Sequence, residues 1–384
     1  MSVETVSLGC RLNFAEAETI SRSAPANEHW VIVNSCAVTN EAVRQTRQAI
    51  RRAHRRRPDA RILVTGCAAE LDRRSFERMP EVARVVGNAD KLAAFDAKTS
   101  VAAGSHSQVR SFVAIQNGCD HRCTFCSIWQ ARGPSISLPF EAIRDAVARE
   151  IDRGAREIVL TGVDITDYSG GLGRLCQRLL IAEPRLNRLR LSSLDSIEID
   201  DALFELLPDE RLMPHFHLSL QAGDDMILKR MKRRHSRAQA VSAVEKIKKL
   251  RAEATIGADL IAGFPTESEE MALNSLKLLN DCDVVAAHIF PFSPRPNTPA
   301  ARMPQLDREI VKARASRLRE AAENRRSAWL QSLVGSIQRV LMESGGKGHN
   351  DSFAPLRVDG AGRGDVLQVR ITGFEGDRLI GVRA

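Results

Sequence analysis

Short apolar runs alternate with longer amphipathic segments along the first hundred residues. Strands and helices that alternate at intervals of roughly 30 residues are typical of βαβ units and a parallel sheet. The loops that leave the carboxyl ends of such strands share one edge of the sheet, which is where ligands bind. The expected strands cover residues 3–8, 30–33 and 61–64, and helices are expected at about 13–22 and 40–57.

The same alternation resumes after residue 110 and continues through the middle of the chain. A repeated βα unit predicts an open or closed barrel with functional groups at the carboxyl ends of its strands. Proline-rich residues 291–299 indicate a loop that closes the barrel. The expected strands cover residues 111–116, 157–161, 189–192, 215–220, 255–261 and 286–290, and the expected helices include 140–153 and 307–331.

Roughly the last fifty residues change to short alternating strands separated by glycine-rich turns. This pattern predicts a small antiparallel barrel, a fold that commonly holds nucleic acid by charge and stacking. Because Phe353 and Phe374 are its only aromatic residues, we expect contact through Arg357, Arg363 and Arg370 instead. The expected strands cover residues 338–343, 353–358, 365–372 and 378–382.

These patterns predict an α/β protein of three domains. The N-terminal parallel α/β domain is expected over residues 1–104, the central partial TIM-type (βα) barrel over 105–333, and the C-terminal antiparallel β-barrel over 334–384. Residues 95–107 weaken into alanine, glycine and serine and indicate a linker. A chain of 384 residues is long enough for three domains and a sizeable buried core.

The charge balance favours a polyanionic partner. The formal net charge is +8, although solubility alone could explain a modest excess. One basic run, residues 229–234, is expected on the mouth side of the barrel, where a polyanion could reach it. The helix at 40–57 presents either a solvated face or an electrostatic footprint for nucleic acid. Its arginines are Arg44, Arg47, Arg51, Arg52, Arg55, Arg56 and Arg57.

The compartment follows from what the chain lacks. No apolar run approaches the ~20 residues needed to cross a bilayer, and the first ten residues have neither a basic n-region nor a cleavage site. We therefore expect a cytoplasmic protein without a membrane segment, in which thiols stay reduced. Eight cysteines in that setting indicate metal binding or catalysis, with Cys176 and Cys282 left over as core residues.

Cys119, Cys123 and Cys126 form a CxxxCxxC loop after the first barrel strand. Three thiolates from one loop can hold three irons of a cubane cluster, and the fourth iron is then open to a small molecule. The alternative is a structural zinc site, which needs a fourth protein ligand. No second pair follows at zinc-finger spacing, and His121 is expected to be an exposed polar residue.

Cys10, Cys36 and Cys67 each follow a predicted strand of the N-terminal sheet. They should meet at one edge of that sheet and form a second three-thiolate site. The alternative is that each cysteine is a small buried residue that fills a βα turn.

Several polar groups at the ends of barrel strands are candidates to line the same mouth. Gly162 has the alternative explanation of a tight turn, and Asp195 that of a helix cap. Gln221, after an apolar strand, is less easily explained in such a way. The candidates are Gly162, Asp164, Ser192, Asp195, Ser219, Gln221, Asp259 and Gly263.

The chain resembles the methylthiotransferase family of radical S-adenosylmethionine enzymes over nearly its whole length. The motifs that carry the resemblance are SLGCRLN at 7–13, NSCAVT at 34–39, VTGC at 64–67, CDHRCTFC at 119–126, LTGVDI at 160–165, HLSLQAG at 217–223 and AGFP at 262–265. The resemblance implies a radical S-adenosylmethionine core for the central barrel and an RNA-binding TRAM-like domain for the C-terminal one.

The resemblance also implies the cofactors, which are two [4Fe-4S] clusters and S-adenosylmethionine. The cluster of Cys119, Cys123 and Cys126 would cleave the cofactor reductively, and the resulting 5′-deoxyadenosyl radical would remove hydrogen from carbon 2 of an adenine. The Cys10, Cys36 and Cys67 cluster would hold the sulfur that is methylated and transferred. The implied partners are tRNA, a sulfur donor and an electron donor such as a flavodoxin or ferredoxin. The implied cofactor-binding residues are Phe125, Gly162, Asp164, Ser192, Gln221 and Asp259.

Within the family, GCRLN at the first cysteine is most similar to the branch that acts on threonylcarbamoyladenosine beside the tRNA anticodon. The isopentenyladenosine branch tends to have GCQMN there, and the ribosomal-protein branch has a lysine before the asparagine. Trp129 and Ile136 depart from the family pattern, which has proline and arginine there, and put local substrate contacts in doubt. Two other readings are a single-cluster enzyme with a clusterless first domain and a non-catalytic iron-sulfur RNA-binding protein.

Overall fold

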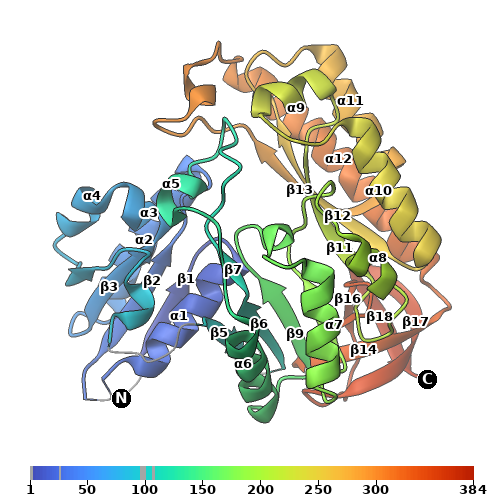
Figure 1. The fold of residues 1–384 in the computed structure, drawn as a ribbon, viewed down its shortest axis with the longest axis horizontal. Helices are drawn as coiled ribbons and strands as arrows, with labels where there is room; N and C mark the ends of the chain where they lie inside the picture. The colour runs from blue at the N-terminus through green and yellow to red at the C-terminus, as the bar shows by residue number, and fades with distance from the viewer. Residues whose placement is uncertain (1–2, 26, 96–100, 106–108) are drawn as a thin grey trace.

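A computed structural model describes residues 3–25, 27–95, 101–105 and 109–384. An N-terminal α/β domain lies beside a central open barrel, and a small β-barrel at the C-terminus lies on the other side of the central one (Figure 1). The expected fold class is therefore confirmed.

The N-terminal domain is built on a parallel sheet in the order β1-β2-β3-β4. Alternate residues of β2 face opposite sides, so Val31 packs with Ile50 of α2, whereas Ile32 packs with Ile20 of α1. This arrangement buries every position of β2. The elements are β1 (Glu4–Ser7), α1 (Arg11–Ser23), β2 (Trp30–Ser35), α2 (Asn40–Arg56), β3 (Arg61–Gly66), α3 (Cys67–Leu71), α4 (Arg73–Glu77), β4 (Arg84–Val85) and η1 (Lys91–Ala93).

The expected linker is replaced in part by a strand. β5 (Ala103–Ser105) pairs antiparallel with β6 (Arg110–Ala114) of the central domain, so the expected boundary after residue 104 falls inside β5. Pairing satisfies the backbone of this small-residue segment, which sequence composition alone had assigned to a loop. The remainder of the linker prediction, at 96–100 and 106–108, lies outside the described residues.

The central domain is an open barrel of two sheets, β5-β6-β9-β10 and β11-β12-β13. Isolated parallel bridges from Leu189 to Leu212 and from Leu194 to Leu218 join them. The strands are β9 (Glu157–Thr161), β10 (Leu189–Leu191), β11 (His215–Gln221), β12 (Thr255–Ala262) and β13 (Val284–Pro291), and β7 (Gln116–Asn117) pairs with β8 (Ile136–Ser137) outside the barrel. The helices are α5 (Ile128–Arg132), α6 (Phe140–Asp152), η2 (Ile165–Asp167), α7 (Leu172–Ala182), α8 (Asp201–Leu206), α9 (Asp225–Met231), α10 (Arg237–Leu250), α11 (Glu269–Asp281), η3 (Pro299–Arg302) and α12 (Arg308–Ser332).

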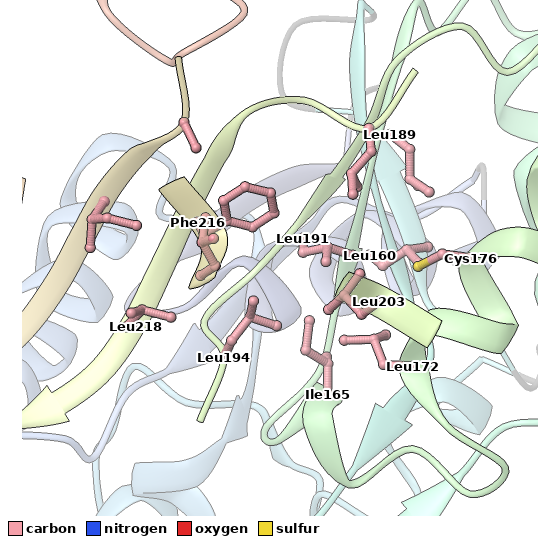
Figure 2. Close-up of a cluster of buried hydrophobic side chains, with 14 of the residues drawn as sticks. Leu160, Ile165, Leu172, Cys176, Leu189, Leu191, Leu194, Leu203, Phe216 and Leu218 are labelled. Atoms are coloured by element: carbon pink, nitrogen blue, oxygen red, sulfur yellow. The ribbon is translucent and has the colours of Figure 1, made fainter. Parts of the chain in front are cut away.

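The main hydrophobic core lies between the barrel strands and the helices outside them. Figure 2 shows leucines of β9, β10 and β11 packed against side chains of α7 and α8. Cys176 of α7 is fully buried among them, and Cys282 belongs to the same cluster. Both cysteines are therefore core residues, as expected.

The C-terminal domain is a closed barrel in the order β14-β15-β16-β18-β17. All neighbouring strands are antiparallel except β16 and β18, which are parallel. The sequence predicts four of the five strands and misses β15, which follows a tight turn at Gly345 and Gly346, both with positive φ. The strands are β14 (Ile337–Ser344), β15 (Lys347–Asn350), β16 (Pro355–Arg357), β17 (Val366–Glu375) and β18 (Arg378–Arg383).

A loop of the C-terminal barrel inserts against the amino-terminal ends of the central strands. Arg190 donates a hydrogen bond to the backbone oxygen of Asp351 at 2.9 Å, and Arg188 pairs with the Asp351 carboxylate. The Phe353 ring lies 4.8 Å from the guanidinium carbon of Arg190. Phe353 is thus occupied by the domain junction rather than open for base stacking.

Candidate functional site

Cys10, Cys36 and Cys67 converge at the carboxyl edge of the N-terminal sheet. Cys10 caps α1, Cys36 directly follows β2, and Cys67 begins α3 after β3. A Cβ atom at Gly9 would lie 2.6 Å from Cys36 Sγ, which shows how closely the first loop passes the second cysteine. Burial, the largest cause, acts together with the nearby Cys10 and Cys67 thiols to raise the pKa of Cys36 to about 11.

Cys119, Cys123 and Cys126 lie in the loop between β7 and α5. The loop is held by hydrogen bonds from Cys119 N to Gly133 O at 3.1 Å and from Thr124 N to Met231 O at 3.0 Å. Burial raises the pKa of Cys126 to about 11, with further contributions from Cys123 and from Cys67 of the other triad. The two triads are therefore close enough for Cys67 to contribute to the pKa of Cys126.

Arg132, the last residue of α5, links the segment that follows the Cys119–Cys126 loop to Cys67 of the other triad. Its Nε donates to Cys67 Sγ at 3.3 Å, and its Nη1 donates to Glu16 Oε1 at 2.7 Å and to Asn117 Oδ1 at 2.9 Å. Its Nη2 donates to Asn13 Oδ1 at 2.6 Å. Arg132 is buried, so one side chain of the central domain fills the space between a cysteine and a helix of the N-terminal domain.

Arg233 has the matching position at the other triad. Its Nη1 lies 3.7 Å from Cys123 Sγ, and its Nη2 donates to Asp195 Oδ2 at 2.8 Å and to Ser219 O at 2.9 Å. The side chain is 7% exposed. Arg233 belongs to the run 229–234, which the sequence predicts on the mouth side of the barrel within reach of a polyanion. It lies beside Cys123, but its ion pair with Asp195 holds the side chain inward, so the expected accessibility is wrong at this position.

His121 is not the exposed residue that the sequence suggests. Its side chain is 9% exposed and lies 3.0 Å from Asp164, 3.4 Å from Glu198 and 3.8 Å from Asp195. The sequence could not show this, because all three carboxylates come from later strand ends. The hydrogen bond with Asp164 raises the pKa of His121 and favours the protonated ring.

The structure offers one group of side chains that could support the zinc alternative. Cys119, His121 and Asp164 have ligand atoms within 4.8 Å of one another. A ring nitrogen of His121 is however already engaged by Asp164 at 3.0 Å.

The strand-end candidates lie around the same mouth. Gly162 has no room for a side chain, because a Cβ atom there would lie 2.8 Å from Gln116 O. Gln116 Oε1 accepts hydrogen bonds from the backbone of Val163 and Asp164, so the turn places the Asp164 carboxylate 3.8 Å from Cys119 Sγ.

The other candidates divide between the mouth and the barrel interior. Phe125 packs against an apolar cluster that includes Phe264 and Met231. Ser192 directly follows β10 and is buried, and Gln221 ends β11 with a positive φ of 65°. Asp259, in the middle of β12, lies deeper in the barrel and accepts hydrogen bonds from two histidines.

Both triads suit an iron-sulfur cluster. Each offers three thiols and one buried arginine that approaches a cysteine sulfur, which compensates the charge of thiolates. Cys119, Cys123 and Cys126 come from one loop, so the first cluster would leave one iron for another ligand. Sequence reasoning missed Glu16 and Arg132 and placed Arg233 in an accessible basic run, because the charged partners of all three come from distant parts of the chain.

The basic helix α2 is largely neutralised. Five of the seven arginines between Arg44 and its C-cap residue Arg57 lie beside carboxylates, which favours the interpretation as a solvated, paired face. The pairs are Arg44 with Glu41, Arg47 with Asp72, Arg51 with Glu81, and both Arg56 and Arg57 with Glu4.

No described helix has both the length and the apolar character needed to span a bilayer.

Comparison with known proteins identifies the family. A threonylcarbamoyladenosine tRNA methylthiotransferase of Rickettsia prowazekii is 41% identical, with 97% of this chain and 95% of that protein covered. The chain belongs to the tRNA methylthiotransferase family. A second methylthiotransferase of that name, from Thermotoga maritima, is 29% identical over 100% of this chain and 97% of its own length. The resemblance inferred from the motifs is thus confirmed.

Other comparisons agree with this methylthiotransferase assignment. The radical SAM superfamily profile matches residues 113–279, and the uncharacterized protein family UPF0004 matches residues 2–87. A tRNA-2-methylthio-N6-dimethylallyladenosine synthase of Erythrobacter litoralis is 30% identical, with 95% of this chain and 93% of that protein covered. The radical S-adenosylmethionine methyltransferase TsrM of Kitasatospora setae shares the fold at a TM-score of 0.55 and 12% identity, over 85% of this chain and 73% of that one.

Proposed function

We propose that this enzyme converts N6-threonylcarbamoyladenosine in tRNA into its 2-methylthio derivative. The observation that supports this function best is the adjacency of two three-cysteine sites, in a chain that is 41% identical to a threonylcarbamoyladenosine tRNA methylthiotransferase. One three-thiol site is enough to activate S-adenosylmethionine. The second would supply the sulfur that a methylthio product requires.

Each triad would hold one [4Fe-4S] cluster in this proposal. The clusters would supply radical initiation at Cys119, Cys123 and Cys126 and sulfur delivery at Cys10, Cys36 and Cys67. Arg132 and Arg233 donate to cysteine sulfurs. In this proposal Phe125, Gly162, Asp164, Ser192 and Gln221 would line the cofactor side of the mouth. Asp259, also among the expected cofactor-binding residues, has a different place in the barrel.

The substrate arrives as tRNA, which carries one phosphate per nucleotide. The closed C-terminal barrel with Arg357, Arg363 and Arg370 is the proposed contact surface for the RNA backbone. An electron donor such as a flavodoxin or ferredoxin and a sulfur donor complete the proposed partners, and the proposed location is the cytoplasm.

Mass spectrometry of tRNA nucleosides from a strain that lacks the protein tests the substrate. We expect loss of 2-methylthio-N6-threonylcarbamoyladenosine, accompanied by accumulation of its unthiolated precursor. Loss of the methylthio form of isopentenyladenosine instead would overturn the substrate and keep the reaction class.

Iron and sulfide analysis of the anaerobically reconstituted protein tests the cofactors. Two clusters predict about eight irons per chain, and a single-cluster enzyme predicts about four. A non-catalytic RNA-binding protein would bind tRNA without forming 5′-deoxyadenosine.

A further inference from the structure

Arg11 directly follows Cys10, and its side chain lies between rings of two other domains. Its guanidinium carbon is 5.9 Å from the centre of the Phe112 ring on β6 and 5.8 Å from that of Phe353 in the C-terminal barrel. Burial and the nearby charge of Arg110 lower the pKa of Arg11 from its ordinary value. Arginine nevertheless keeps its charge in proteins. A half-buried cation therefore stands where all three domains meet.

Arg11 has no anionic partner at short range. Within residues 3–25, 27–95, 101–105 and 109–384, no carboxylate lies within ion-pair distance and no group accepts a hydrogen bond from its side chain. Arg110, which lies over the same Phe353 ring, differs because it pairs with Glu157 and Glu343. Aromatic contact alone leaves the N–H donors of Arg11 without acceptors.

Asp259 is near enough to act on the charge of Arg11 but is already engaged. Its Oδ1 accepts hydrogen bonds from His217 Nε2 at 2.9 Å and from His288 Nδ1 at 3.1 Å. Burial would raise the pKa of Asp259, but these two histidines hold it well below its ordinary value. The close packing of His217 on Gly257, where a Cβ atom would lie 2.5 Å from Nδ1, fixes this wall of the barrel.

The place of Arg11 beside the auxiliary triad limits what it can bind. Consecutive Cα atoms are about 3.8 Å apart, so Arg11 begins next to the Cys10 ligand. If the base carbon that receives sulfur approaches the cluster held by Cys10, a substituent on the same base can extend into the barrel toward Arg11. A guanidinium fork matches a carboxylate in both charge and shape.

We propose that Arg11 binds the carboxylate of the substrate's threonylcarbamoyl group and so selects an anionic N6 substituent over a neutral one. This assignment rests on the proposed function. A backbone phosphate offers the same anionic chemistry, but the half-buried site between Phe112 and Phe353 suits a small group on the base better than the exterior of an RNA strand.

Binding of two anticodon stem-loop RNAs tests the assignment. One carries threonylcarbamoyladenosine, and the other carries its methyl ester, in which a methyl group replaces the negative charge of the carboxylate. Dissociation constants and methylthiolation kinetics are measured with the cluster-reconstituted full chain and with Arg11→Gln and Arg11→Lys. Arg174→Gln, which removes an exposed arginine of α7, is the matched control.

The parent protein is expected to bind the acid roughly 10- to 100-fold more tightly than the ester, as a charge-assisted hydrogen bond implies. Arg11→Gln should reduce this ratio to about 1, Arg11→Lys should retain part of it, and Arg174→Gln should keep it. Iron content of each variant shows whether the neighbouring cluster was lost, and the binding ratio is read in either case.

Two results would overturn the assignment. If Arg11→Gln leaves both affinities and the preference for the acid unchanged, another group binds the carboxylate. If it weakens the acid and ester RNAs equally, Arg11 contacts a phosphate. Failure of the proposed function looks different, because the parent protein would then leave the threonylcarbamoyl RNA unmodified and methylthiolate an isopentenyladenosine RNA.

Discussion

At the residue scale, buried charges next to the cysteines explain more of the site than the cysteines alone. Glu16 is 3% exposed, and its carboxylate lies 2.5 Å from Lys91 Nζ and 2.7 Å from Arg132 Nη1. The two cations exceed the one anion, and the extra positive charge lies beside Cys67. A cysteine that is deprotonated to hold metal therefore completes the charge balance of this buried group.

Arg132→Gln is predicted to destabilise the reduced form of the cluster held by Cys10, Cys36 and Cys67, here called the auxiliary cluster. It is also predicted to weaken the contact between the N-terminal and central domains. Loss of one charge-assisted N–H···S bond should lower the cluster's reduction potential by about 40 mV, equivalent to about 1 kcal/mol. Loss of the Glu16 pair should lower the melting temperature of the metal-free protein as well. Redox titration followed by electron paramagnetic resonance, together with a thermal scan, measures the two effects.

Arg233→Gln is the matched variant, because it should shift the other cluster and leave the signal near Cys67 unchanged. An unchanged auxiliary potential in Arg132→Gln would contradict the role of its hydrogen bond to Cys67.

We expect the ion pairs of Glu16 to make the folded protein less stable against unfolding in acid. Burial would raise the pKa of Glu16, but Arg132 and Lys91 lower it to about 2 in the folded protein. Since the folded pKa lies below the unfolded value of about 4.3, the stabilisation is complete above that pH and is lost as pH falls toward 2. A shift of about 2 units corresponds to about 3 kcal/mol.

The melting temperature of Glu16→Gln, measured from pH 7 to pH 3, checks this prediction. Relative to the parent it should be lowest at pH 7, and the two curves should approach each other as the pH falls. Curves that stay parallel would show that the ion pair is not what responds to acid.

At the element scale, the turn between β1 and α1 determines whether the auxiliary triad can close. Gly9 has a φ of 88°, which favours glycine, and a Cβ atom there would lie 2.6 Å from Cys36 Sγ. Gly9→Ala should therefore displace Cys10 or Cys36 and reduce iron from about eight to about four per chain. Iron analysis after anaerobic reconstitution measures the loss.

Gly154→Ala is the control that separates backbone strain from the steric clash with Cys36. Gly154 also has a positive φ, 98°, but no atom lies within 4 Å of the added methyl group. It should keep all its iron. Full iron content in Gly9→Ala would contradict the close approach of its loop to Cys36.

Much of this element pattern could be predicted from the sequence, because burial on both faces makes parallel strands readable. The strand at Glu157–Thr161 agrees with the prediction at both ends, and the cysteines follow their strands as expected. The remaining features depend on long-range contacts. Glu16 lies on a helix in which a charged residue usually faces water, and nothing near it in the chain announces Lys91 or Arg132. The His121 error has the same origin.

At the scale of the whole molecule, the three domains meet around one aromatic ring. Phe353 of the C-terminal barrel lies under guanidinium groups from Arg11 of the N-terminal domain and from Arg110 and Arg190 of the central barrel. Glu157 is fully buried and accepts from Arg190 at 2.9 Å, so its negative charge compensates part of this positive group. The C-terminal barrel is therefore part of the central domain's structure as well as the proposed RNA contact.

Phe353→Ala is predicted to loosen the C-terminal barrel without unfolding it. The ring stacks on His215 at 5.5 Å and on His349 at 4.5 Å between centres, and its removal should cost about 3 kcal/mol at the junction. The barrel keeps its own core of Leu356, Val369 and other residues, so it should remain folded. Limited proteolysis should then cut after α12 faster than in the parent, with a separate melting transition for the released barrel. Phe374→Ala, which removes a partly buried ring that packs against the core cluster of the same barrel, should lower the barrel's melting temperature without faster cleavage after α12. Equal cleavage rates in the two variants would show that Phe353 does not hold the domains together.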